Sequence, residues 1–179
     1  FPLIKSERVD KILELLKDLD DDDHNVAHVT RFVHSLQTAT RAYEDGADEE
    51  TIVAALLHDV GDNVATIMSE DHSEIAARIL RPFVSEKTHW VVQHHGIFQG
   101  YYYLHHFGSD RNLRDKFKSS PHYQDCVDFC HKYDQVAFDP NYEFKPLEFF
   151  EPMVRRIFAR EPKFASASIM AEAFAKHSA

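Results

Sequence analysis

Glycine and cysteine are scarce in this sequence, and long hydrophobic runs are absent. The 179 residues include 5 glycines and two cysteines, Cys126 and Cys130, which are too few for a disulfide scaffold. The cysteines lie one helical turn apart, and we expect them to be buried thiols rather than a redox pair. The longest apolar run, residues 52–57, is far shorter than the roughly 20 residues that cross a bilayer.

A surplus of basic residues is also missing. Lysine and arginine total 20 against 30 aspartates and glutamates, and the net charge of −10 argues against a nucleic-acid partner. No N-terminal basic segment precedes an apolar one, so no secretory signal is visible. We therefore expect a cytoplasmic protein whose partner is a small molecule, with neither a nucleic acid nor a membrane.

Aromatic residues and histidine are abundant. The 14 Phe, 7 Tyr and 1 Trp supply enough apolar area for a core, which excludes a disordered chain. Apolar residues recur mostly at spacings of three and four, which predicts helices joined by short loops. We expect one all-α domain over residues 1–179, with a weakly packed tail from about residue 164. The predicted helices begin near residues 6, 25, 48, 71, 85, 123 and 146.

The doublet His58-Asp59 directly follows residues 52–57, a helical segment that is apolar on every side. Such a helix is typical of the centre of a bundle. A carboxylate at the edge of a core costs several kcal/mol unless a cation, a metal or N–H donors compensate it. The residues alone leave two interpretations open: a metal site, or an Asp that caps the next segment beside a hydrogen-bonded core His.

Further candidate ligands are ambiguous when each is taken alone. His34 falls opposite the apolar stripe of its predicted helix, so periodicity predicts an exposed side chain. His72 could be a surface residue of a first helical turn, and only one of His94 and His95 is expected to point inward. Asp134 could instead pair with Lys132.

Together these residues form a set of nitrogen and oxygen donors without a thiolate. Such a set suits iron, manganese or zinc, and six protein ligands exceed what one zinc ion binds. A carboxylate has two oxygens, so Asp59 could bridge two ions about 3.5–4 Å apart. The candidate metal ligands are His34, His58, Asp59, His72, His95 and Asp134.

Two segments resemble the HD-domain superfamily, which is named for its metal-binding His-Asp doublet. They are FVHSLQTATRAYEDGADEETIVAALLHDVGD at residues 32–62 and FCHKYDQVAFD at residues 129–139. Within the superfamily, HSLQTA followed by GAD and AALLHD is most similar to the small mixed-valent diiron oxygenases. That branch includes myo-inositol oxygenase and the oxygenases that cleave 1-hydroxy-phosphonates.

The resemblance implies an all-α HD-domain helical bundle with a buried dinuclear metal site. It implies that the six candidates hold two irons, Fe(II) and Fe(III), with Asp59 as the bridge and His58 beside it in the catalytic centre. Oxygen would be the co-substrate, and a C–P or C–C bond of a small 1-hydroxylated substrate would be cleaved. The alternative on the same fold is a metal-dependent phosphohydrolase for a nucleotide or a phosphate monoester. It predicts basic residues beside the metals, and few lie near His58 and Asp59 in the sequence.

The sequence departs from these relatives where they contact the substrate. Asp62 replaces a basic residue, Gln99 replaces a lysine, and His131 is a candidate for the basic residue that precedes the last Asp. Tyr101 begins a run of three tyrosines. The faces of these rings could attract a cationic group of the substrate at about 0.5–2 kcal/mol each, or the rings could simply pack in the core. We therefore expect a substrate with an ammonium or quaternary ammonium group and an oxyanion, in contact with Asp62, Gln99, Tyr101 and His131.

Overall fold

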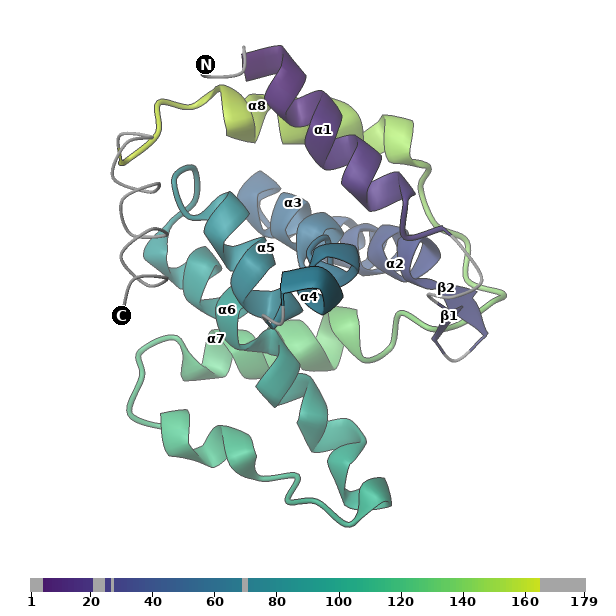
Figure 1. The fold of residues 1–179 in the computed structure, drawn as a ribbon. Helices are drawn as coiled ribbons and strands as arrows, with labels where there is room; N and C mark the ends of the chain where they lie inside the picture. Colours follow the sequence, from purple (N-terminus) through teal and green to yellow (C-terminus); the bar gives the residue numbers. More distant parts are fainter. Residues whose placement is uncertain (1–4, 21–24, 27, 69–70, 165–179) are drawn as a thin grey trace.

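The computed structural model describes residues 5–20, 25–26, 28–68 and 71–164, and the regular secondary structure of this part is helical apart from one small hairpin (Figure 1). This confirms the predicted all-α class. The predicted weakly packed tail lies, from residue 165 onward, outside the described residues. No helix of the described part is long and apolar enough to cross a bilayer. The principal elements are α1 (Lys5–Lys17), β1 (Asn25–Val26), β2 (Val29–Thr30), α2 (Arg31–Glu44), α3 (Glu49–Leu57), α4 (Asp62–Met68), α5 (His72–Leu80), α6 (Glu86–Gln99), α7 (Tyr123–Phe129) and α8 (Leu147–Ala159).

Helix α3 lies at the centre of the bundle, as its uniformly apolar sequence predicts. All six residues from Ile52 to Leu57 are buried, and α3 packs against α2, α6 and α8. Helices α1 and α8 lie side by side across one end of the molecule (Figure 1). Burial on every face fixes the position of α3, and the doublet that follows it is therefore held inside the protein.

Polar side chains cap several helices where the sequence predicts them. Asp48 accepts a hydrogen bond from the backbone N–H of Thr51, Asp71 from that of Ser73, and Ser85 from that of Thr88. Each bond satisfies a backbone donor that the first helical turn leaves unpaired. The starts of α3, α5 and α6 are thus set by local interactions.

The predicted start of the second helix is wrong. The chain forms an antiparallel hairpin, in which Asn25 pairs with Thr30 and Val26 with Val29, before α2 begins at Arg31. The Thr30 side chain caps α2 by accepting from the backbone N–H of Val33, and this stops the helix from extending backward. Helix α4, directly after the doublet, is an element that periodicity did not predict.

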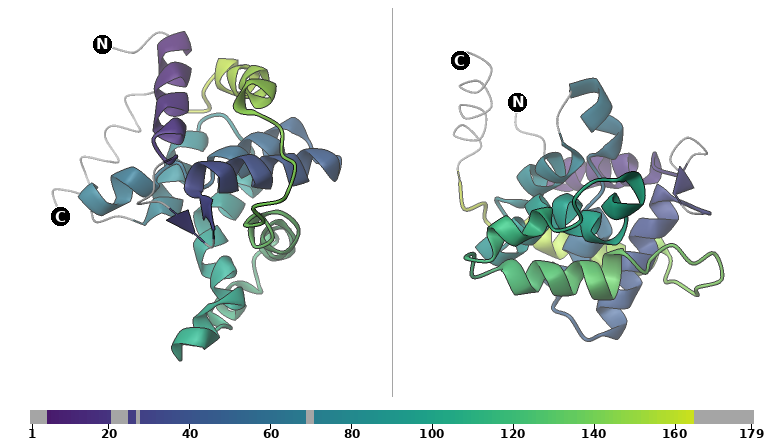
Figure 2. Two further views of the ribbon diagram at one scale, coloured as in Figure 1. Left: turned by 90° about the vertical axis from the view of Figure 1, so that its right-hand side faces the viewer. Right: turned by 90° about the horizontal axis from the view of Figure 1, so that it is seen from below.

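Helix α6 continues into an arm that extends away from the bundle (Figure 2). The arm contains the 3-10 helices Gly100–Tyr102, Leu104–Phe107 and Leu113–Phe117, after which the chain returns as α7. The predicted helix over residues 123–136 is α-helical only to Phe129. It continues as a π-helix, Cys130–Asp134, and π-helical turns often occur at functional sites.

Candidate metal centre

The structure brings all six candidate ligands together. They come from segments that are far apart in the sequence. His34 lies near the start of α2, His58 and Asp59 directly follow α3, and the others lie on α5, α6 and the π-helix. Five of the six are at most 2% exposed, and the His72 side chain is 28% exposed at one edge of the cluster. These six residues are His34, His58, Asp59, His72, His95 and Asp134.

The two carboxylate oxygens of Asp59 face two different pairs of histidines. Oδ2 lies 3.3 Å from Nε2 of His58 and 3.5 Å from Nε2 of His34. Oδ1 lies 3.3 Å from Nε2 of His72 and 3.2 Å from Nε2 of His95. The side chain therefore stands between two groups of donors, which is the arrangement of a bridging carboxylate.

Asp134 completes the first of these groups. Its Oδ1 lies 3.1 Å from Nε2 of His34 and 3.5 Å from Nε2 of His58. Its Oδ2 is buried and has no hydrogen-bond partner among the described residues. A buried acceptor without a partner costs about 1–3 kcal/mol, more when it is charged, so this oxygen suits a cation or a bound water.

Backbone hydrogen bonds orient three of the imidazoles. Nδ1 of His34 lies 3.0 Å from the carbonyl oxygen of Ala137, and Nδ1 of His58 lies 2.7 Å from that of Ala55. His95 contacts the backbone in the same way, 2.6 Å from the Val92 oxygen. When each Nδ1 donates its proton there, Nε2 presents a lone pair to the centre, which is the usual state of a metal-binding histidine.

The distances between the nitrogen and oxygen atoms of the cluster fit ligands that share one metal ion. Ligands about 2.0–2.1 Å from one ion lie about 3.0–3.4 Å from each other along an octahedral or tetrahedral edge. The contacts around Asp59 and Asp134 span 3.1 to 3.5 Å. The groups His34, His58, Asp134 and His58, Asp59, His95 each offer donor atoms that lie within 4.8 Å of one another. The residues present therefore fit metal binding.

The electrostatics of the cluster attract positive charge. Burial lowers the pKa of His58, but the Asp59 and Asp134 carboxylates outweigh it and hold that pKa well above its ordinary value. Burial likewise raises the pKa of Asp59, but His58 and the hydrogen bonds from His72 and His95 hold it well below its usual range. The pKa of Asp134 is lowered in the same way, chiefly by His58 against the effect of burial. Both carboxylates are therefore ionised and ready to bind a cation.

Two glycines allow α5 to approach the doublet. A Cβ at Gly61 would lie 2.8 Å from the His72 carbonyl oxygen and 2.7 Å from the Ile75 Cβ, which is too close for any side chain. A Cβ at Gly96 would lie 2.9 Å from Oγ of Ser73. This close packing places His72, the first residue of α5, against Asp59.

The burial of His34 corrects the exposed position that helical periodicity predicts. Its side chain is fully buried, because residues 137–139 cover the second face of α2. The Phe138 ring stacks on the His34 ring with centroids 4.2 Å apart. Periodicity within one helix cannot show which distant segment covers its other face.

Neighbouring residues are placed away from the cluster. His94 stacks on Trp90 with ring centroids 3.9 Å apart and does not approach Asp59 as His95 does. Lys132 lies 3.9 Å from Asp45 rather than pairing with Asp134. The two cysteines are free and buried, as predicted.

Arg31 is a site residue that the sequence reasoning missed. Its Nη1 donates to Oδ2 of Asp59 at 3.1 Å, and its Nε lies 3.5 Å from Oδ2 of Asp62. The signal was present in the sequence, because Arg31 lies three residues before His34 and thus on the same side of the helix. Beside His58 and Asp59 there is therefore a basic group.

A cavity of about 480 Å³ opens over the cluster. Arg31 and Gln99 line it, together with four of the candidate ligands and an aromatic wall of Tyr102, Tyr103 and Phe138. Of the four predicted substrate contacts, only Gln99 belongs to the lining. Asp62 pairs with Nε of Arg31 outside the lining. His131 is exposed, and its Nδ1 lies 3.2 Å from the Tyr102 hydroxyl. The guanidinium carbons of Arg111 and Arg114 lie 3.9 and 3.7 Å from the centroid of the Tyr101 ring and cover it.

Comparison with known families supports the interpretation of the doublet. The HD-domain family matches residues 31–131, more than half of the chain, and this span contains Arg31 and five of the six candidate ligands. A comparison with curated proteins gave no match. The buried His-Asp doublet and the helical bundle around it agree with this match. This chain therefore belongs to the HD-domain family, whose members are typically metal-dependent enzymes.

Proposed function

We propose that this protein is a non-haem diiron oxygenase that uses O2 to cleave a C–P or C–C bond of a small 1-hydroxylated substrate. The observation that carries the proposal is the division of the two Asp59 oxygens between two pairs of histidines. Such a carboxylate suits two ions rather than one. The resemblance of the HSLQTA and AALLHD segments to the diiron oxygenases supports oxygenase rather than hydrolase chemistry.

The donor set suits iron. Four imidazoles and two carboxylates, without a thiolate, are the nitrogen and oxygen ligands that non-haem iron prefers. His34, His58 and Asp134 would hold one ion, His72 and His95 the other, and Asp59 would join them. When bound, a mixed-valent pair supplies Lewis acidity toward the substrate hydroxyl and redox chemistry with O2.

Arg31 would bind the anionic group of the substrate. Its guanidinium lines the cavity next to Asp59, and arginine binds carboxylate, phosphonate and phosphate groups through paired N–H donors. Asp62 lies 3.5 Å from Nε of Arg31, so it would hold the guanidinium in place rather than touch the substrate. In this way a new basic group replaces the ones that the relatives carry at other positions.

Gln99 would recognise a hydrogen-bond donor of the substrate. Its Oε1 is buried beside the cavity and has no partner among the described residues. A hydroxyl or ammonium group of a ligand would satisfy this oxygen and recover about 1–3 kcal/mol. The aromatic wall of Tyr102, Tyr103 and Phe138 would keep water away from the reacting group.

The alternative function is a metal-dependent phosphohydrolase for a nucleotide or a phosphate monoester. Arg31 is the observation that favours it, because a guanidinium beside the metal ligands also suits a transferring phosphoryl group. Two metal ions held by the same ligands would then supply an activated water molecule, and no O2 would be consumed.

Metal analysis and oxygen uptake separate these two functions. Protein produced in iron-rich medium should contain about two irons and give a mixed-valent electron paramagnetic resonance signal after partial reduction. It should consume O2 with a 1-hydroxy-phosphonate, with or without a trimethylammonium group, or with a polyol. Zinc or manganese in place of iron, with anaerobic release of phosphate from nucleotides, would establish the hydrolase instead.

A further inference from the structure

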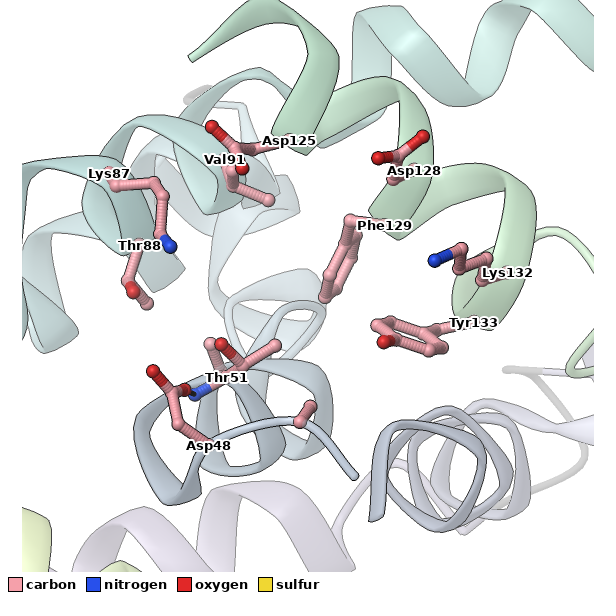
Figure 3. Close-up of a pocket in the computed structure, with 12 residues that line it drawn as sticks. Asp48, Thr51, Lys87, Thr88, Val91, Asp125, Asp128, Phe129, Lys132 and Tyr133 are labelled. Atoms are coloured by element: carbon pink, nitrogen blue, oxygen red, sulfur yellow. Dashed lines mark hydrogen bonds between the residues drawn. The ribbon is translucent and has the colours of Figure 1, made fainter. Parts of the chain in front are cut away.

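A second cavity, of about 290 Å³, lies between α3, α6 and α7 (Figure 3). It shares no lining residue with the cavity over the metal centre. Its volume lies just below the range for small-molecule pockets, about 300–1,000 Å³, so it suits a compact ligand.

Three kinds of side chain line this cavity. Lys87 and Lys132 stand on opposite sides of the cavity. Asp125 and Asp128 lie on α7, which forms a third side (Figure 3). Between the charged groups lies an apolar floor whose side chains are at most 6% exposed: Ala54, Val91 and Phe129. The cavity therefore offers ammonium groups, carboxylates and an apolar surface within one small volume.

The charged groups are largely unused by the protein itself. Neither Lys87 nor Asp125 forms a hydrogen bond or an ion pair with another residue of the described part, although the charge of Lys87 helps to lower the pKa of Asp48, a third carboxylate of the lining. Asp128 accepts one hydrogen bond, from Gln124 at 2.9 Å, and Lys132 lies 3.9 Å from its nearest acid, Asp45. Unpaired charges of both signs around an apolar floor are complementary to a zwitterion with an apolar part.

We propose that this cavity binds a free α-amino acid with an apolar side chain. Lys87 contacts its carboxylate, Asp125 contacts its ammonium group, and its side chain packs on Val91 and Phe129. Phe129 separates this cavity from the metal centre, because its ring packs edge-on against the His58 ring with the ring centroids 5.9 Å apart. The site is independent of the reaction that the metal centre performs.

Calorimetric titration of the purified full chain tests this proposal. The ligands are glycine, L-alanine, L-valine, L-leucine and L-methionine, together with 4-methylpentanoate and isoamylamine, which each lack one charged group of leucine. We expect an amino acid with an apolar side chain to bind, glycine to bind more weakly, and each leucine analogue to bind at least about tenfold more weakly than leucine, since one charge-assisted contact is lost. Failure of all five amino acids to bind, or equal binding of isoamylamine and leucine, overturns the proposal.

Two variants locate the binding to this cavity. Asp125→Asn and Lys87→Gln each remove one charge that forms no ion pair in the protein, so the fold is preserved. Each should weaken amino-acid binding about tenfold or more. The control Glu86→Gln changes an exposed neighbour outside the lining and should leave binding unchanged. Amino-acid binding that persists in both variants places the ligand elsewhere and overturns the assignment.

Discussion

Nε2 of His34 and Nε2 of His58 face each other at 3.1 Å inside the protein. The opposite nitrogen of each ring lies within hydrogen-bond distance of a backbone carbonyl, that of Ala137 for His34 and that of Ala55 for His58. When both rings are neutral and donate those protons to the backbone, two lone pairs face each other in a buried volume, which is unfavourable unless a positive charge lies between them. A bound cation supplies that charge, and without one the raised pKa of His58 favours a proton there. This pair of nitrogens can therefore bind either a proton or a cation.

Removal of metal should therefore lower the stability of the protein. A ligand that binds only the folded state stabilises it by about 2.7 kcal/mol at a hundredfold excess over its Kd. We expect chelator-treated protein to unfold at a lower temperature, and added Fe(II) or Zn(II) to restore the original melting temperature. Thermal unfolding followed by circular dichroism measures this, and an unchanged melting temperature after verified metal removal would contradict it.

The bridging position of Asp59 predicts an unequal effect of two substitutions. Asp59→Ala should abolish the binding of both ions, because each of its oxygens faces a different histidine pair. His72→Ala should reduce the content from two ions to one, since His72 belongs to one pair only. Elemental analysis of purified protein checks both, with His94→Ala as the matched control beside His95. Two ions retained by Asp59→Ala would exclude the bridge.

Arg31→Gln should weaken the binding of an anionic substrate without removing metal. The loss of a charge-assisted contact costs about 1.5–3 kcal/mol, which corresponds to a KM about 10- to 100-fold higher. Inorganic phosphate as a competitive inhibitor gives an independent readout of the same contact. Arg111→Gln is the control, because Arg111 stacks on Tyr101 outside the cavity lining. An unaltered KM and an unaltered inhibition constant would remove Arg31 from substrate binding.

Glu50 predicts an acid-sensitive contribution to stability. Burial raises its pKa, but hydrogen bonds from Ser85, Thr88 and Arg160 outweigh burial and hold the pKa below its ordinary value of 4.5. A pKa that is lower in the folded state stabilises the protein above the unfolded value and loses that contribution as pH falls through the folded value. Glu50→Gln should cost about 1–2 kcal/mol at pH 7 and progressively less below pH 4.5. Denaturant unfolding across this pH range measures the difference, and a cost that is independent of pH would refute it.

Sequence reasoning was most successful for features that depend on neighbours along the chain. The caps Asp48, Asp71 and Ser85 begin helices where they were predicted, because a cap bonds to a backbone N–H two or three residues away. It failed at residues 25–30, where a helical apolar pattern was interrupted by a hairpin and by the Thr30 cap. The sequence contains the competing local signal, because Thr30 is a residue type that favours the N-cap position of a helix.

The sequence by itself determined the helical class and the central position of α3, and it named the six candidate metal ligands. Tertiary structure alone decided that residues 137–139 bury His34, that Arg31 reaches Asp59, and that each Asp59 oxygen faces its own histidine pair. Helix formation follows from spacing and capping within a few residues. The metal centre instead arises where distant segments pack, and packing depends on contacts that no local pattern contains.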